Sequence, residues 1–365
     1  MVKRILFLVL CLAFSFSIAM AQEEESSKNN TNHTSLTIPV RGWGITFGNS
    51  ERTNGIRFNL MDDHVEEVNG FNFTFWKPGK NPDFKMHGVS LALVGVTYEE
   101  AWGINVSGVG MAGNNNTGIN VAGVGMAGNN YTGIHVAGIG MAGDHYTGIN
   151  IAGIGMAGDN YSVVNVAGIG MAGGNHTGFN LAGVGMAGDK YTGINLTGIG
   201  MAGERYAGIN VAGIGMAGEH YTGINVSGIG MAGDNYTGVN VAGIGIRSKN
   251  IKGINLAGIS MGLKFSKRTG ISVDADKMTG FNFGTLGIGS REIKGVGLSA
   301  GGILCDEFTG VSVGSIQRMK NQMSGLSIGL FNMTRRLKGV QIGLINYVED
   351  NPPLLRILPV INFGR

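Results

Sequence analysis

Cysteine and proline are scarce in this 365-residue chain, and both scarcities limit the fold. One of the two cysteines, Cys11, falls in an apolar N-terminal segment, so that Cys305 has no intrachain partner and a disulfide framework is excluded. None of the six prolines lies between residues 83 and 351. Because proline removes a hydrogen bond from a β-ladder, this stretch can support uninterrupted sheet pairing.

Long apolar segments are also missing beyond the N-terminus, so the sequence contains no candidate for a membrane-spanning helix. Residues 1–21 are predicted to be a secretory signal peptide, with Lys3 and Arg4 at its basic end, an apolar stretch, and the small residues Ala19 and Ala21 at the cleavage site. A flexible polar lead-in is expected over 22–36. We therefore expect an exported protein at the cell surface or outer membrane of a bacterium.

Glycine, in contrast, is abundant and periodic. It occupies 30 of the 32 fifth-residue positions from Gly103 to Gly258, with Val163 and Ser248 as the exceptions. Since glycine in a helix interior costs about 1 kcal/mol relative to alanine, this pattern excludes helices. The five-residue period lies within a 15-residue one, Gly-Ile-Asn-Val-Ala-Gly-Ile-Gly-Met-Ala-Gly-Asp-Asn-Tyr-Thr, which is typical of stacked solenoid coils.

A coil of 15 residues explains the repeat better than a coil of 20, because only the shorter coil stacks identical residues, such as Asn105 on Asn120 and Met111 on Met126. The sequence therefore predicts an all-β fold, a repeat β-solenoid with 15-residue, three-sided coils. An outer-membrane β-barrel is the alternative, since apolar residues alternate in an exported chain.

Residues at equivalent positions of successive coils form columns. The columns of Ile104, Val106, Val109 and Met111 are the expected core. The Asn105 column, in which His135 replaces one asparagine, is expected to form a ladder of hydrogen-bonded amides. The most variable positions, which include the tyrosines, are expected to face solvent.

The iterated Gly-Ile-Asn-Val-Ala-Gly-Ile-Gly-Met-Ala-Gly motif, the segments Asn54–Leu60 and Asn69–Phe73, and the segment Gly339–Asn346 together resemble a known group. They are similar to the bacterial surface-repeat proteins described from Leptospira and common in Bacteroidetes. The resemblance covers nearly all of the chain after the predicted signal peptide. It implies a location at the cell surface and carries over no catalytic residue.

A column of tyrosines is the best candidate for a binding site. Exposed, stacked rings make a flat amphipathic strip that suits sugars or protein partners, whereas rings that only cover the turn are the structural alternative. The column comprises Tyr131, Tyr146, Tyr161, Tyr191, Tyr206, Tyr221 and Tyr236.

Motifs for catalysis and for cofactors are not found. The sequence has no nucleophile paired with a base, no phosphate loop and no zinc spacing, so we expect no enzymatic activity, no cofactor and no metal. The acidic column that contains Asp144 supplies one carboxylate per coil, which is too few for calcium. Asp62, Asp63 and His64 are expected to lie in a solvated turn, with a metal site as the alternative.

Charge is distributed unevenly, with a net charge of −4 over residues 103–245 and +9 over residues 246–347. The basic third is expected either to be a solvated face or to contact anionic envelope lipids or polysaccharide. Its bases include Lys264, Lys267, Arg268, Arg335, Arg336 and Lys338.

The repeat pattern divides the rest of the chain into an N-terminal cap with degenerate repeats (37–102), ten regular 15-residue repeats (103–252), degenerate basic repeats (253–347) and a C-terminal cap (348–365). These observations predict a non-catalytic scaffold of the cell surface or envelope. Its expected partners are surface glycans or other surface proteins, and not nucleic acid. An outer-membrane barrel and a polysaccharide-binding or polysaccharide-acting β-helix are the alternatives.

Overall fold

The computed structural model describes residues 35–40, 43–261, 263–264, 272–273 and 275–364. The predicted signal peptide and most of the predicted lead-in therefore lie outside the described residues. The chain forms two compact units, one ending at Asp189 and the other beginning at Lys190. Strand β12 (Gly185–Thr197) contains the boundary between them.

Both units are built from β-strands. Those of the first unit are β1 (Ser35–Val40), β2 (Trp43–Gly48), β3 (Arg52–Asn59), β4 (Glu67–Thr74), β5 (Lys85–Ala92), β6 (Gly95–Ser107), β7 (Gly110–Ala122), β8 (Gly125–Ala137), β9 (Gly140–Ala152), β10 (Gly155–Ala167) and β11 (Gly170–Ala182).

The second unit has strands of the same kind and one short 3-10 helix. Its elements are β13 (Gly200–Ala212), β14 (Gly215–Ser227), β15 (Gly230–Ala242), β16 (Gly245–Ala257), β17 (Ser260–Met261), β18 (Leu263–Lys264), β19 (Ser272–Val273), β20 (Lys277–Gly284), β21 (Gly287–Ile328), β22 (Phe331–Val348), η2 (Pro353–Leu355) and β23 (Ile357–Gly364).

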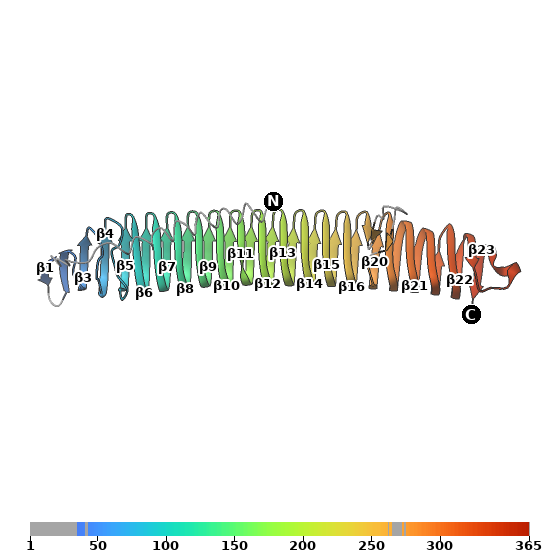
Figure 1. The fold of residues 1–365 in the computed structure, drawn as a ribbon, viewed down its shortest axis with the longest axis horizontal. Helices are drawn as coiled ribbons and strands as arrows, with labels where there is room; N and C mark the ends of the chain where they lie inside the picture. The colour runs from blue at the N-terminus through green and yellow to red at the C-terminus, as the bar shows by residue number, and fades with distance from the viewer. Residues whose placement is uncertain (1–34, 41–42, 262, 265–271, 274, 365) are drawn as a thin grey trace. The chain divides into compact units, whose positions relative to one another are not determined.

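Successive coils pair in parallel with a shift of one repeat, as Figure 1 shows within each unit. In the first unit Met111 lies opposite Met126 and Asn116 lies opposite Tyr131, and in the second unit Tyr206 lies opposite Tyr221. The predicted β-solenoid with 15-residue coils is confirmed. The alternative of an outer-membrane barrel is wrong, because such barrels are built from antiparallel neighbours.

The interior of the coil differs from the expected one. Asn105 is fully buried, whereas Ile104 is 42% exposed and Val106 and Val109 are half-buried. Of the four columns predicted to be the core, only that of Met111 is buried. The prediction assumed that the largest apolar side chains fill the interior. The coil instead encloses the asparagine column, small residues such as Ala122, the methionines and the tyrosines, and it turns isoleucine and valine outward.

Glycine is required where neighbouring coils approach each other closely. Gly118 has φ +114°, and a Cβ atom there would lie 2.1 Å from the carbonyl oxygen of Gly103. Val163 occupies an equivalent position with φ 79°, a conformation that strains a β-branched residue. By contrast, a Cβ atom at Gly110 would meet only the Gly125 oxygen, at an ordinary 3.8 Å. Some positions of the five-residue glycine period therefore require glycine, whereas others have room for a side chain.

The pairing direction changes at the end of each unit. β1 pairs antiparallel with β2, and β23 pairs antiparallel with the last coil strand, β22. Each of these strands occupies backbone groups of its neighbour that would otherwise be free to pair with another chain. The capping roles that the sequence suggests for 37–54 and 348–365 remain predictions.

One coil of the second unit carries an insertion. Gly253 lies opposite Gly280 instead of a residue 15 positions later, and the hairpin of β18 and β19 falls between them. The register shows that the coil after Gly253 begins at Gly280.

Candidate functional site

The tyrosine column is buried, so the prediction that it forms an exposed strip was wrong. All seven rings are 0 to 1% exposed. In the first unit Tyr131 and Tyr146 stack with ring centroids 5.0 Å apart and planes 5° apart, and in the second unit Tyr206 and Tyr221 stack at 4.7 Å. The Tyr131 hydroxyl donates to the Ala127 carbonyl at 2.9 Å. Because the rings face inward, they can bind neither a glycan nor a protein.

The seven tyrosines were expected outside because they belong to the side of the coil that varies most between repeats. Asp144 and His145 are indeed exposed, but the next residue, Tyr146, points into the coil. Flat rings stacked along the axis fill the interior without voids, and burial raises the pKa of Tyr146 well above its usual range. The column is therefore structural.

The asparagine column forms the predicted amide ladder. Asn105 Nδ2 donates to Asn120 Oδ1 at 2.8 Å, and Asn210 does the same to Asn225 in the second unit. His135 replaces one rung, with its Nδ1 3.1 Å from Asn120 Nδ2. Each side chain satisfies part of the hydrogen-bonding capacity of its neighbour, which explains how amides can occupy the interior.

Two buried histidines interrupt these columns in the first unit. His135 stands in the asparagine column, and His176 stacks on Tyr161 at 5.0 Å in the tyrosine column. Both are fully buried. Burial lowers the pKa of each histidine to about 4, because the imidazolium form would lose its hydration. At neutral pH both rings are therefore uncharged.

Asp62 lies in a buried ion pair rather than in the expected solvated turn. The Arg57 guanidinium donates to Asp62 Oδ1 at 2.6 Å, to Asn72 Oδ1 at 3.2 Å and to Asn49 Oδ1 at 2.8 Å. Thr74 Oγ1 donates to the second Asp62 oxygen at 2.6 Å. Burial lowers the pKa of Arg57, and the Asp62 charge counteracts this effect. This pair was not predicted from the sequence, because Arg57 stands at a position where other coils have an asparagine of the ladder.

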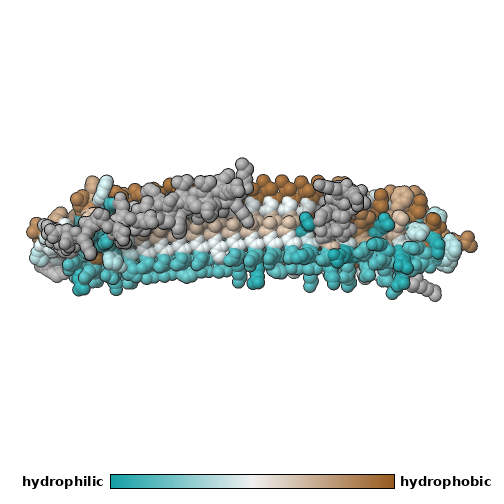
Figure 2. Space-filling model, viewed as in Figure 1, coloured by the Kyte–Doolittle hydropathy of each residue, from teal (hydrophilic) through white to brown (hydrophobic). Residues whose placement is uncertain are grey.

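The exposed side chains of each regular coil are divided between an apolar face and a polar edge. The polar edge carries the columns of Asn114, Asn115 and Thr117, which include Asp144 and Glu219. The apolar face carries the columns of Ile104, Val106 and Val109. Figure 2 shows this separation as hydrophobic side chains gathered along one border of the view and hydrophilic ones along the opposite border.

In the first unit the apolar face of the regular coils contains no polar side chain. Its members from Ile104 to Val184 are Ile104, Ile119, Ile134, Ile149, Val164, Phe179, Val106, Val121, Val136, Ile151, Val166, Leu181, Val109, Val124, Ile139, Ile154, Ile169 and Val184. The isoleucines of the Ile104 column are 39 to 42% exposed here. In the second unit Ile194, Ile209 and Ile224 continue the same pattern at 39 to 43%. Contiguous apolar surfaces of this kind mark interaction sites in soluble proteins.

Exposed tryptophans lie at both margins of the apolar face in the first unit. Trp102 pairs in register with Thr117, directly before the glycine that precedes Ile104, and it is 62% exposed. Trp43 holds the equivalent place before Gly44 and is 60% exposed. Trp76, which is 55% exposed, lies at the bend on the other margin, where its backbone N–H donates to the Leu60 carbonyl at 2.8 Å. These three are all the tryptophans of the chain.

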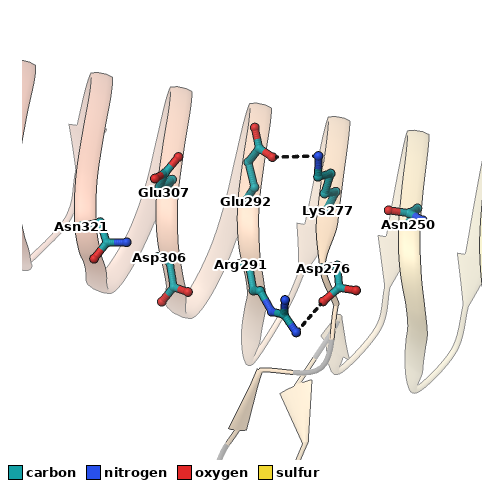
Figure 3. Close-up of a pocket in the computed structure, with 8 residues that line it drawn as sticks. All are labelled: Asn250, Asp276, Lys277, Arg291, Glu292, Asp306, Glu307 and Asn321. Carbon is teal, nitrogen blue, oxygen red and sulfur yellow. Dashed lines mark ion pairs between the residues drawn. The ribbon is translucent and has the colours of Figure 1, made fainter.

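The second unit has a shallow depression of about 450 Å³ on its polar edge. Figure 3 shows its lining residues on successive coils: Asn250, Asp276, Lys277, Arg291, Glu292, Asp306, Glu307 and Asn321. Arg291 lies 3.1 Å from Asp276, and Lys277 lies 3.5 Å from Glu292. A hydrogen bond from Lys294 lowers the pKa of Glu292. The two bases of the lining are thus paired with two of its four carboxylates, and exposed pairs of this kind add little stability.

Several basic residues of the C-terminal third are paired with carboxylates. Arg335 and Arg336 each lie 3.6 Å from Asp350, and Lys249 donates to Asp234 at 2.8 Å. Lys267 and Arg268 lie outside the described residues. The paired bases project from the polar edge and not from the apolar face. Contact of this third with anionic lipids or polysaccharide remains a prediction.

Within the described ranges, no three histidine, cysteine, aspartate or glutamate side chains are placed to hold a metal ion. Cys305 is buried, and burial raises the pKa of its thiol. Among the same residues, none of the helices has the length and hydrophobicity to cross a bilayer. No family model matches the chain, and neither the curated proteins nor the solved structures contain a match.

Proposed function

We propose that the chain is an exported, non-catalytic repeat protein of the bacterial cell surface or envelope, which acts as a binding scaffold. The observation that carries this proposal is the uniformity of the exposed columns. From β7 to β11, the exposed positions of the apolar face hold an aliphatic residue or phenylalanine in every coil. A ligand therefore meets the same chemistry at each step along the unit, whereas catalysis needs one unique constellation.

The filled interior supports the same proposal. Asparagine, methionine and tyrosine columns occupy the centre of each regular coil, so the groups available to a partner are on the outside. The polysaccharide-binding alternative loses its main support, since the tyrosines expected to bind sugars are buried. The proposed location at the cell surface or envelope is supported by the resemblance to bacterial surface-repeat proteins and by the predicted signal peptide.

Export can be tested by expressing the full-length chain in a Gram-negative host and fractionating the cells. We expect the mature protein to begin at Gln22, to leave the cytosol and to be degraded when protease is added to intact or outer-membrane-permeabilised cells. An Ala19→Lys, Ala21→Lys variant, which damages the cleavage site, should accumulate as a membrane-bound precursor. A wild-type chain that keeps its leader and stays in the cytosol would overturn the proposal.

A further inference from the structure

We infer that the apolar face is a docking surface for a lipid membrane, an inference that rests on the proposed export of the chain to the envelope. The exposed isoleucine and valine columns would enter the boundary between head groups and acyl chains, while the polar edge stays in water. Amphipathic elements that lie on membranes divide their surface in the same way. The surface meant is the apolar face of the first unit, from Ile104 to Val184.

The composition of the apolar face suits a partner without fixed atomic positions. From Ile104 to Val184 it offers no side-chain donor, acceptor or charge. Protein interfaces usually combine apolar area with about ten hydrogen bonds and with anchors such as tryptophan or arginine near their centre. A hydrocarbon layer needs neither hydrogen bonds nor a register, and it gains from every aliphatic side chain that leaves water.

The tryptophans are placed at the margins of the face and not at its centre. Trp102 borders one side of the face at its first regular coil, Trp43 holds the same place in β2, and Trp76 follows β4 on the other side; all three are 55 to 62% exposed. Tryptophan is enriched at the level of the lipid head groups, because its ring is apolar and its N–H needs a polar partner. When the aliphatic centre of the face enters the acyl-chain region, the tryptophans at its margins come to lie at the level of the head groups.

Charge is kept away from the apolar face. The charged side chains of the regular coils, such as Asp144 and Asp159, belong to the polar edge. Binding through the face should therefore depend little on the charge of the lipid or on salt. This separates it from contact through the basic C-terminal third, which would need anionic lipid and would weaken as salt screens the attraction.

A second copy of the chain is the competing occupant. Two such faces could pack as stacked sheets, about 10 Å apart. However, identical columns make registers that differ by one coil nearly equal in energy, so a dimer of defined geometry is poorly specified. In such a dimer, the tryptophans at the margins of one face would also have no matching residue at the centre of the other face to pack against. The observations therefore favour lipid.

The experiment is co-flotation of the purified mature chain with vesicles of phosphatidylcholine alone or with added phosphatidylglycerol, at low salt and at 1 M NaCl. We expect comparable flotation with both compositions, retained at high salt, and a blue shift of tryptophan fluorescence on binding. Brominated acyl chains should quench that fluorescence. Sedimentation without lipid measures self-association in the same preparation.

Matched variants locate the binding surface. Ile119→Thr, Ile134→Thr and Ile149→Thr together keep β-branched residues but make the apolar face polar, and we expect at least a tenfold weaker partition into phosphatidylcholine vesicles. Thr117→Ser, Thr132→Ser and Thr147→Ser alter exposed residues of the same coils on the polar edge and should leave partition unchanged. Circular dichroism confirms that both variants fold.

Three results would overturn the inference: no flotation with either vesicle, flotation that needs anionic lipid and is lost at high salt, or a stable oligomer that does not bind vesicles. The test uses purified protein and does not depend on cellular location. Failure of lipid binding would therefore leave export intact, and a cytosolic chain that still floats with vesicles would refute the proposed function alone.

Discussion

The buried histidines of the first unit should make the solenoid sensitive to mild acid. His135 and His176 are both fully buried, and both have a pKa lowered to about 4, whereas an unfolded histidine titrates near 6.5. Between these values the unfolded chain binds a proton that the folded chain excludes. Stability is therefore complete above about pH 6.5, falls as the pH decreases and reaches its lower limit below about pH 4.

The size of the effect follows from the difference in pKa. A shift of about 2.5 units corresponds to roughly 3 kcal/mol per histidine once both states are protonated, and to about 2.5 kcal/mol at pH 4.5. Two sites together should therefore cost about 5 kcal/mol between pH 7.5 and pH 4.5. This is a large fraction of the stability of an ordinary domain.

The residues that neighbouring coils carry at the two histidine positions suggest the substitutions for this test. His135→Asn restores the asparagine ladder between Asn120 and Asn150, and His176→Tyr continues the ring stack on Tyr161. We expect the double variant to lose most of the acid sensitivity. His145→Asn removes an exposed histidine in the same unit and should leave the pH dependence as in the wild type.

Urea unfolding followed by circular dichroism at pH 7.5 and pH 4.5 measures the difference directly. Because stacked coils can open locally, hydrogen exchange over residues 125–180 should show the same loss of protection on acidification. Equal pH dependence in the wild type and the double variant would refute the reasoning, since it would mean that the folded coils accommodate the imidazolium.

Three further changes test the local structure by thermal unfolding. Val163→Gly should raise the melting temperature, because relief of the strained φ, at roughly 1–3 kcal/mol, outweighs the entropy cost of glycine; an unchanged or lower value would contradict the strain. Gly118→Ala should destabilise the first unit strongly, whereas Gly110→Ala should have little effect, and equal effects would refute the steric argument. Asp62→Ala should cost about 3–5 kcal/mol by leaving Arg57 buried without its counterion, and a neutral result would show that the pair is dispensable.

The fold could be predicted from the sequence because the length of the repeat determines which residues of successive coils lie opposite each other. Of the two coil lengths compared, only 15 residues places identical residues on top of each other. The pairing of Met111 with Met126 confirms this length. The amide ladder followed from the same argument, since asparagine returns at one position in nearly every coil. Both results depend on repetition and not on the size or polarity of a residue.

The inside and the outside of the coil could not be predicted in the same way. Hydrophobicity assigned Ile104 to the core, variation between repeats assigned the tyrosines to solvent, and the structure reverses both. The coil interior is narrow, so flat rings and amides that bond along the axis fill it better than branched side chains do. One signal was present in the sequence: asparagine recurs with a single exception, which is unusual for an exposed position, whereas isoleucine exchanges freely with valine in the Val109 column.

The buried ion pair of Arg57 and Asp62 was missed for a different reason. It lies in the irregular coils, where the period that reveals the rest of the fold is weak. Sequence alone showed an acidic turn near a degenerate repeat. Only the register of β3 and β4, which places Arg57 opposite Asn72, shows that an arginine has entered the ladder and needs a carboxylate beside it.

The exact correspondence of residues between adjacent coils has a consequence for the gene. Each regular coil meets its neighbours through the same contacts, so removal of one coil, or insertion of another, joins two surfaces that already fit. An in-frame recombination between two repeats of the coding sequence should therefore yield a folded protein of a different length. Strains can be expected to differ in the number of regular repeats while the irregular coils at the two ends, which contain the unique side chains, stay constant in length.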